Sequence, residues 1–330
     1  MTAYRALQCD RLSNDLSGLR YVERSALPPA PGQVAVQMRA MALNFPDLLM
    51  TRGGYQHKPE LPYVVGMEGA GVITEVGEGV TGWKAGDAVC FSNLVGAIAE
   101  RNHVPASALE PVPKGWDWAS AAGWRVGAVT AHAALVVRGQ LRAGETVLVH
   151  GATGGMGAAA VQLGAHLGAR VIATGTRADW LELLKPMGAS HCLSSRDAFQ
   201  DEVKAITGGA GADVIYDPVG GDVFDRSTKC IAFGGRLMVV GFAAGRIPTL
   251  AANHVLIKTY SVVGVRAGEW MRKRPHEAPA IRAEINALAA QGVFKPLIGA
   301  RYTFDQALDA LRALEARQAP GKIVIEISAD

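Results

Sequence analysis

The sequence predicts an α/β protein in which a doubly wound, six-stranded parallel sheet is combined with a smaller, irregular β domain. Two observations predict this fold class. Strand-like and helix-like patterns alternate between residues 124 and 265, as in a sheet built from crossover units. The first 123 residues instead show short apolar runs broken by Gly and Pro, which is typical of bent strands in a small barrel.

Composition and length exclude several other classes. The chain has 330 residues, of which 49% are hydrophobic and 39 are Gly, and this suits a packed protein of two domains. Its net charge of +3 does not require nucleic acid or a membrane as a partner. No apolar run of about 18 residues predicts a membrane span, and we expect no signal peptide, because the first ten residues are charged and lack an apolar core. The four widely spaced cysteines favour a reducing cytoplasm over disulfides or a zinc cluster.

Residues 145–174 predict a strand, a glycine turn, a helix and a second strand. Gly154 and Gly155 remove the Cβ atoms that would keep the backbone from a pyrophosphate, and Gly157 lets the helix lie close to the strand. The N–H groups around Met156 and the helix dipole then favour an anion. We predict a dinucleotide site here, although Ala152 stands where the first fingerprint glycine is expected; a purely structural turn is the alternative.

The end of the second strand indicates which dinucleotide binds. NAD sites usually carry an acidic residue there, to hold the ribose 2′-hydroxyl. This chain has Thr174-Gly175-Thr176-Arg177, so a cation follows the strand end and a 2′-phosphate is favoured. We therefore predict NADPH (NADP+) as the cofactor. A solvated surface role for Arg177 is the alternative, and we expect Asp179 to begin the next helix.

The remaining elements follow in chain order. The first domain is predicted to contain strands at 33–41, 64–80, 84–91 and 96–103, and a helical stretch at 117–138 leads out of it. We expect the domains to comprise residues 1–123 with 266–330, and residues 124–265. Later strands are predicted at 146–150, 170–174, 191–193, 213–216, 236–241, 260–265, 297–302 and 322–327, with helices at 158–167, 179–187, 198–207, 222–231, 279–291 and 304–317.

Four longer motifs resemble the zinc-independent quinone oxidoreductase branch of the medium-chain dehydrogenase/reductase superfamily. They are ALNFPDLLMTRGGY (42–55), LPYVVGMEGAGVITEVGEGVTGWKAGDAV (61–89), VHGATGGMGAAAVQLG (149–164) and PGKIVIEI (320–327). The resemblance implies a GroES-like, barrel-type domain built from both chain ends and a Rossmann domain inserted between them. It also implies an active site in the cleft.

The resemblance implies that this protein works without zinc. Zinc-dependent relatives carry Cys where this chain has Asn44, and His where it has Met67. Neither Asn nor Met suits zinc, which prefers thiolate and imidazole ligands. We therefore predict no metal, and we assign no catalytic role to Glu68.

Without a Lewis acid, a conjugated acceptor is an easier hydride acceptor than a simple carbonyl, because it delocalises the charge. By resemblance, Asn44 is expected near the nicotinamide and the substrate, and Asp47 is expected to fix the loop. Tyr55 matches a tyrosine that lines the pocket in quinone reductases and donates a proton in enoyl-thioester reductases. An ordinary loop aromatic is the alternative for Tyr55.

The resemblance implies further cofactor contacts, at Thr130, Ser195, Gly241, Phe242, Val265 and Lys322. Ser195 stands where NADPH-selective relatives often have Tyr, which leaves Arg177, with Arg196, to hold the 2′-phosphate. Arg125 replaces a neutral residue of the relatives. It is open whether Arg125 binds an anionic substrate or pairs with a carboxylate.

The sequence thus predicts an NADPH-dependent reductase of quinones or α,β-unsaturated carbonyl compounds. One alternative is an enoyl-thioester (enoyl-CoA) reductase, with 272–274 (Arg-Lys-Arg) at the pocket mouth. The other is a non-catalytic NADPH-binding protein, which nothing in the sequence favours, since no basic stripe with aromatics predicts nucleic acid. We expect a homodimer through the sixth strand of the parallel sheet.

Overall fold

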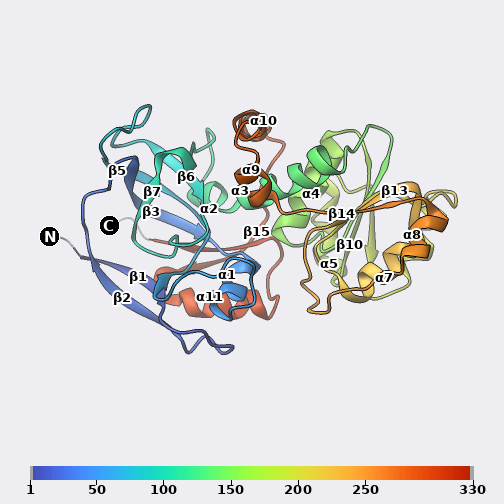
Figure 1. Ribbon diagram of the computed structural model, residues 1–330, viewed down its shortest axis with the longest axis horizontal. Coiled ribbons are helices and arrows are strands. Elements are labelled where there is room, and N and C mark those ends of the chain that lie inside the picture. Colours follow the sequence, from blue (N-terminus) through green and yellow to red (C-terminus); the bar gives the residue numbers. More distant parts are fainter. Residues whose placement is uncertain (1–2, 328–330) are drawn as a thin grey trace. The chain divides into compact units, whose positions relative to one another are not determined.

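The computed structural model describes residues 3–327, which form two compact units. Unit 1 contains the chain up to Val126 and again from Pro296, and unit 2 contains Gly127–Lys295. Figure 1 shows the C-terminal elements of unit 1, in red, among its blue N-terminal elements. The return to unit 1 therefore begins at residue 296, and not at the predicted residue 266.

Unit 1 is built on two sheets. A three-stranded sheet has the order β2-β1-β4, and a seven-stranded sheet has the order β15-β16-β3-β5-β6-β8, with β7 on β3. All these pairs are antiparallel except β15 with β16. The strands are β1 (Ala3–Cys9), β2 (Leu19–Ser25), β3 (Gln33–Ala42), β4 (Tyr63–Val64), β5 (Glu68–Val76), β6 (Ala88–Ser92), β7 (Arg101–Pro105), β8 (Leu109–Pro111), β15 (Ile298–Thr303) and β16 (Lys322–Glu326).

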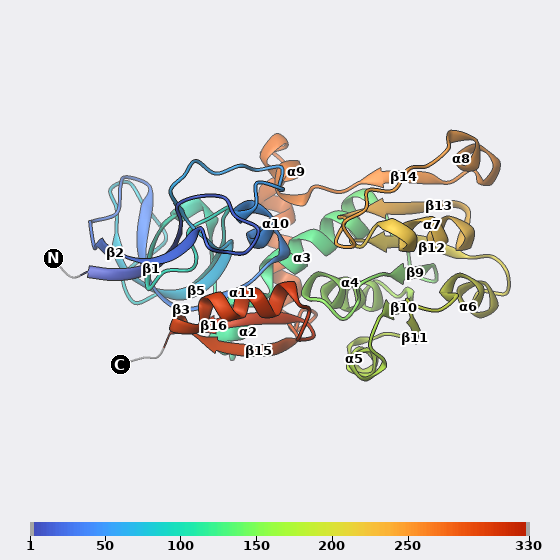
Figure 2. The same cartoon turned by 90° about the horizontal axis from the view of Figure 1, so that it is seen from below.

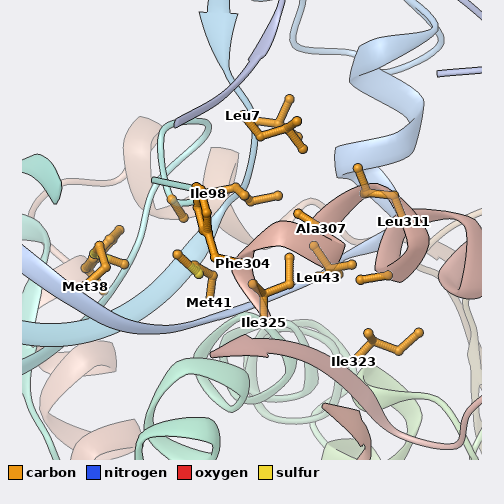
Figure 3. Packing of buried hydrophobic residues seen from close by; sticks show 14 of the residues in the cluster. Leu7, Met38, Met41, Leu43, Ile98, Phe304, Ala307, Leu311, Ile323 and Ile325 are labelled. Atoms are coloured by element: carbon orange, nitrogen blue, oxygen red, sulfur yellow. The ribbon is translucent and has the colours of Figure 1, made fainter. Parts of the chain in front are cut away.

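The core of unit 1 joins the two ends of the chain. Figure 3 shows Leu7 and Met38 from the first strands packed with Phe304, Leu311 and Ile325 from the C-terminal segment. Apolar burial of this kind explains why the last segment folds back onto the first, since alone it would be too short to bury a core. The helices of this unit are α1 (Phe45–Thr51), η1 (Ala106–Ala108), α2 (Trp118–Gly123), η4 (Phe304–Gln306) and α11 (Ala307–Glu315), and α3 (Arg125–His132) runs from it into unit 2.

Unit 2 contains a six-stranded parallel sheet with the order β11-β10-β9-β12-β13-β14. Figure 2 shows its strands in this sequence from β14 at the top to β11 at the bottom. The order reverses between β9 and β12, which is the topological switch point of a doubly wound sheet. The strands are β9 (Thr146–Val149), β10 (Arg170–Gly175), β11 (His191–Ser194), β12 (Ala212–Asp217), β13 (Ile231–Val239) and β14 (Ser261–Gly264).

Short helices connect the strands of unit 2. A π-helical segment, η2 (Ala133–Arg138), follows α3 directly. No helix within residues 3–327 is both long and apolar enough to cross a bilayer. The other helices are α4 (Gly155–His166), α5 (Ala178–Glu182), η3 (Lys185–Met187), α6 (Phe199–Ile206), α7 (Gly221–Cys230), α8 (Ala252–Lys258), α9 (Ala267–Lys273) and α10 (Ala278–Ala290).

Side-chain contacts hold the segment 266–295 in unit 2. The Gln162 amide of α4 donates to the Lys295 carbonyl oxygen and accepts from its N–H, both at 2.7 Å. Glu284 of α10 lies 3.1 Å from the buried His132 ring of α3. These specific contacts across the sequence could not be read from periodicity, which explains the difference in the predicted boundary.

Candidate active site

The parallel sheet brings most of the predicted cofactor residues to one edge of unit 2. Each follows or ends a strand, so all lie at the carboxyl edge of the sheet, where α/β proteins bind ligands. The glycine turn follows β9, Thr174 is near the end of β10, and Ser195 follows β11. Gly241 and Phe242 follow β13, and Val265 follows β14. Thr130 is half-buried on α3, which precedes β9, so it does not follow a strand of this sheet.

The glycine turn has the geometry that a diphosphate requires. Gly154 is the N-cap of α4, and it offers no side chain to the N–H groups of the first helical turn, which have no carbonyl partner within the helix. Those N–H groups, at Gly155 and Met156, and the positive end of the helix dipole suit an anion. A Cβ on Gly157 would lie 2.2 Å from the Gly151 carbonyl oxygen, so only glycine permits this close packing.

A buried histidine supports the turn. His150 is 0% exposed, and its ring nitrogens lie 2.7 Å from the hydroxyls of Thr174 and Ser227. Ser227 donates its only hydroxyl hydrogen to the Val223 carbonyl oxygen (2.6 Å), so Nε2 of His150 carries the ring hydrogen and Nδ1 accepts from Thr174. Burial lowers the pKa of His150 to about 3, so the ring is neutral.

Thr174 also supports the turn, because its side chain is buried and its carbonyl oxygen accepts from the Ala152 N–H at 3.0 Å.

The sequence analysis did not identify His150 or Asp217 as site residues. Asp217 is the last residue of β12, and its carboxylate accepts from the N–H groups of Val219 (2.8 Å) and Gly220 (2.9 Å). Burial raises the pKa of Asp217 to about 6. Its place at the end of a predicted strand was the signal that could have identified it.

Arg177 stands at the rim of the same edge. Its guanidinium is 51% exposed, contacts both carboxylate oxygens of Asp179 and lies over the Trp180 ring at 4.4 Å. Asp179 lies in the first turn of α5, as expected. Ser195 is half-buried, and Arg226 of α7 donates to its carbonyl oxygen at 2.6 Å. Arg177 is thus pre-oriented by stacking, and its exposed pair with Asp179 is weak enough to exchange for a phosphate.

Unit 1 contains a separate buried polar cluster, formed by Asn44, Asp47, Glu68 and Lys322, which we call the Asn44 cluster. None of the four residues is more than 5% exposed. The Asn44 side chain donates to Glu68 Oε1 (3.0 Å) and accepts from Lys322 Nζ (2.7 Å), and Lys322 Nζ also donates to Glu68. Glu68 Oε2 accepts from the Val126 N–H at 3.0 Å.

The Asp47 carboxyl group of this cluster binds the backbone of Asn44. Its Oδ2 accepts from the Asn44 N–H at 2.8 Å, at the start of α1, while its Oδ1 has no hydrogen-bond partner among the described residues. Burial raises the pKa of Asp47 to about 7, although the Asn44 N–H and the nearby Lys322 favour the carboxylate. Asp47 therefore fixes the loop, as expected from the sequence.

The structure decides between the two alternatives for Arg125, but not between those for Tyr55. Arg125 Nη2 lies 2.7 Å from Glu110 Oε1, and both side chains are at most 7% exposed, so Arg125 pairs with a carboxylate. Tyr55 is half-buried in the loop after α1 and packs against the core of unit 1. Its predicted role stays a prediction.

Within residues 3–327, no group of three or more His, Cys, Asp or Glu side chains is placed to hold a metal ion. Asn44 and Met67 occupy the positions at which zinc-dependent relatives were expected to carry ligands. The Asn44 cluster instead contains the ammonium group of Lys322 beside Glu68.

Comparison with known proteins decides the family. The family model described as the alcohol dehydrogenase GroES-like domain matches residues 30–161, and the model described as zinc-binding dehydrogenase matches residues 155–286. The quinone oxidoreductase-like protein 2 homolog of Nematostella vectensis is 36% identical over 98% of this chain and 89% of its own length. The chain belongs to the medium-chain dehydrogenase/reductase superfamily. It falls in the quinone oxidoreductase-like branch, and the predicted GroES-like and Rossmann fold is confirmed.

Solved structures of this superfamily superpose over nearly the whole chain. A mycobacterial protein complexed with NADPH has a TM-score of 0.88 and 31% identity, covering 98% of this chain and 99% of its own. The Escherichia coli quinone oxidoreductase complexed with NADPH has a TM-score of 0.87 and 27% identity, with the same coverage.

Proposed function

We propose that this protein is an NADPH-dependent oxidoreductase that reduces quinones or α,β-unsaturated carbonyl compounds without zinc. The observation that carries the proposal is the glycine turn at the switch point of the six-stranded sheet, where Gly157 is required by close packing. Similarity to a quinone oxidoreductase and to two NADPH complexes supports the choice of cofactor and acceptor.

Each part of the carboxyl edge has a proposed share in holding NADPH. The N–H groups of Gly155 and Met156 bind the diphosphate, because they lie in the first turn at a helix N-terminus, and Gly154 leaves room for the diphosphate by having no side chain. Arg177 binds the 2′-phosphate by exchanging its exposed contact with Asp179. The remaining proposed contacts are Asn44, Thr130, Ser195, Gly241, Phe242 and Val265. Two further residues are proposed to act indirectly, Thr174 by holding the turn and Lys322 by holding the Asn44 amide.

When bound, NADPH supplies a hydride to the conjugated acceptor. The chain then has to supply a proton and a fixed position for the acceptor. We assign the proton to the Tyr55 hydroxyl, which can act as a general acid toward the reduced oxygen. We assign positioning to the Asn44 amide, whose orientation is set by two charged neighbours.

The test is NADPH oxidation in the presence of a chelator, with para-quinones, enones and an enoyl-CoA offered in parallel. We expect quinone or enone turnover that falls about 100-fold in Tyr55→Phe, the lower range for loss of a general acid. Tyr302→Phe is the matched control, because Tyr302 is also half-buried against the core of unit 1. Full activity of Tyr55→Phe would remove Tyr55 from the mechanism. Tight NADPH binding without any turnover would instead favour a non-catalytic protein.

The enoyl-CoA alternative depends on the cations at 272–274. Arg272 contacts Glu269 with both its Nε (3.0 Å) and its Nη2, and Arg274 contacts Glu277 at 2.8 Å while lying over the Trp270 ring at 4.2 Å. These pairs are exposed, like that of Arg177 with Asp179, so they do not exclude a CoA phosphate, and the parallel assay with enoyl-CoA decides. Similarity to a quinone oxidoreductase favours the quinone or enone reductase as the proposed function.

We also propose that two copies of the chain form a dimer through β14. This strand ends the parallel sheet, with β13 as its only neighbour in the described order. Val262 of this strand is 40% exposed, and on the preceding helix α8 the apolar side chains Leu256 and Ile257 are 78% and 73% exposed. Pairing β14 with its twin would cover this edge. Light scattering should show a dimer that Leu256→Glu with Ile257→Glu converts to a monomer; a wild-type monomer at micromolar concentration would contradict the proposal.

A further inference from the structure

The Asn44 cluster joins three segments of unit 1 that are far apart in sequence. Asn44 begins α1, Glu68 begins β5 and Lys322 begins β16. Burying an ammonium and a carboxylate is costly unless their hydrogen bonds are satisfied, so such a cluster needs an explanation beyond stability. Its contacts converge on one neutral group, the Asn44 amide.

The two charges determine which way the Asn44 amide points. Its NH₂ group faces the Glu68 carboxylate at 3.0 Å, and its oxygen faces the Lys322 ammonium at 2.7 Å. Rotating the amide by half a turn would place NH₂ against the ammonium and oxygen against the carboxylate, and both contacts would be repulsive. Lys322 also contacts Glu68 directly, so neither charge can move alone. The amide therefore has one orientation.

The contacts also determine what Asn44 can offer to a ligand. One amide hydrogen is directed to Glu68, and the other is directed more weakly to the Ala42 carbonyl oxygen at 3.4 Å. The oxygen of the amide has two lone pairs, of which Lys322 uses one. The Asp47 N–H also faces the Asn44 side chain in the capping box of α1, but its one hydrogen is donated to the Asn44 carbonyl oxygen at 2.9 Å. The remaining capacity is a single lone pair on Oδ1. Toward a ligand, Asn44 is therefore an acceptor, and it is not placed to stabilise an oxyanion.

Glu68 is in turn fixed by the backbone. Its Oε2 accepts from the Val126 N–H at 3.0 Å, in the first turn of α3, where a carboxylate is also favoured by the helix dipole. Other ionisable groups near Glu68 are Asp47, the Cys90 thiol and the Arg125–Glu110 pair. Of these, Asp47 lies nearest to Asn44: its carboxylate accepts from the Asn44 N–H, and its own N–H faces the Asn44 side chain in the capping box of α1.

We propose that Lys322 and Glu68 are positioning residues that lock the Asn44 amide as a hydrogen-bond acceptor for an N–H or O–H group of the nicotinamide cofactor or the substrate. Lys322 thus acts through Asn44 and not on a phosphate of the cofactor. This inference rests on the proposed function, which places Asn44 at the reacting groups. It leaves the stabilisation of a developing oxyanion to other donors, such as Tyr55.

A double-mutant cycle tests the proposal. We expect Lys322→Met and Glu68→Gln each to lower kcat/KM by about 10- to 100-fold, the usual cost of misplacing a positioning group. Asn44→Ala should have a similar effect, and adding Lys322→Met to Asn44→Ala should cost little more, because both act through one amide. Lys185→Met is the matched control. It also removes a lysine from an ion pair, but that pair with Glu182 is exposed and lies outside the proposed site, so it should leave kcat/KM within about twofold.

Additive losses in Lys322→Met and Asn44→Ala would overturn the proposal, as would full activity of a folded Lys322→Met protein. If Lys322→Met does not fold, Glu68→Gln with Lys322→Met leaves no buried charge in the pair and serves in its place. The same cycle is measured on the NADPH dissociation constant by nicotinamide fluorescence. If no acceptor is turned over, the proposed function fails, but non-additivity in NADPH binding would still support the positioning role and additivity would still contradict it.

Discussion

The two units each bury a polar network, and the networks differ in charge. In unit 1 the Asn44 cluster contains a carboxylate and an ammonium with an exposed fraction of at most 5%. In unit 2 the His150 network joins a neutral imidazole to two hydroxyls. Both hold a backbone segment in place, since Asp47 binds the Asn44 N–H and Thr174 binds the Ala152 N–H.

This difference in charge predicts how each network should respond when a substitution removes one of its members. Removing one partner of a buried ion pair leaves an uncompensated charge, whereas removing a neutral hydrogen-bonding group leaves only unpaired dipoles. A substitution in the charged network should therefore lower the free energy of unfolding more. A substitution in the neutral network should mainly change how the free energy of unfolding depends on pH. Three variants test this difference.

Lys322→Met should have the largest effect on stability. It leaves Glu68 buried without its cation, and we expect a loss of about 3–5 kcal/mol in the free energy of unfolding. Chemical denaturation measures this directly. Lys185→Met is the matched control, since it removes a lysine from an exposed pair with Glu182 and should change stability little. Equal losses of stability in the two variants would show that the buried pair of Lys322 with Glu68 contributes no more to stability than an exposed pair.

His150→Phe should have an intermediate effect. It keeps a ring but leaves the hydroxyls of Thr174 and Ser227 without a ring partner, at a cost of about 1–3 kcal/mol near neutral pH. The pKa of His150 is lowered from 6.5 to about 3, so the unfolded chain binds more protons between these values. Wild-type stability should therefore fall as pH falls from 6.5 toward 3, by at most about 1.4 kcal/mol per pH unit from this group.

Stability measured along the same pH series should show that His150→Phe loses this dependence. If the variant and the wild type have parallel pH profiles, His150 is not the group that titrates. Asp217, which is buried with a pKa of about 6, contributes a slope of the opposite sign and is present in both proteins.

At pH 4, Asp47→Asn should have the smallest effect of the three variants, and the pH dependence that Asp47 contributes to stability is opposite in sign to that of His150. Because the pKa of Asp47 is raised from 3.8 to about 7, the folded chain binds more protons in this range, and wild-type stability is lost as pH rises through it. Asp47→Asn should be near neutral at pH 4 and increasingly stabilising toward pH 7, with no further change above. A difference that stays constant from pH 4 to pH 8 would contradict a raised pKa for Asp47.

Much of the fold could be predicted because strand and helix periods are local. The run 146–149 and the glycines after it predicted β9, the turn and α4. Gly157 does permit a close approach of the helix, but to Gly151 and Ala152 in the turn and not to the strand itself. The boundary near residue 296 could not be predicted, since it depends on contacts such as Gln162 with Lys295 that no local pattern encodes.

For the same reason, the positions of some candidate site residues could be predicted from local patterns, whereas those of others could not. Residues at strand ends, such as Ser195 and Gly241, could be placed because parallel strands end at one edge. The partners of Asn44 could not be predicted, because Glu68 and Lys322 are 254 residues apart along the chain and only the folded sheet of unit 1 brings them together. Buried polar networks are three-dimensional, and a single sequence does not show which charges meet.

The most direct test of the account is the affinity of the wild-type protein and of Arg177→Ala for NADPH and NADH, measured by nicotinamide fluorescence. We predict tighter binding of NADPH by the wild type and a loss of about 10- to 100-fold for NADPH alone in Arg177→Ala, the value of one charge-assisted contact. Equal affinity of the wild type for both cofactors, or an Arg177→Ala variant that keeps its preference, would contradict the assignment of NADPH to this edge of the sheet.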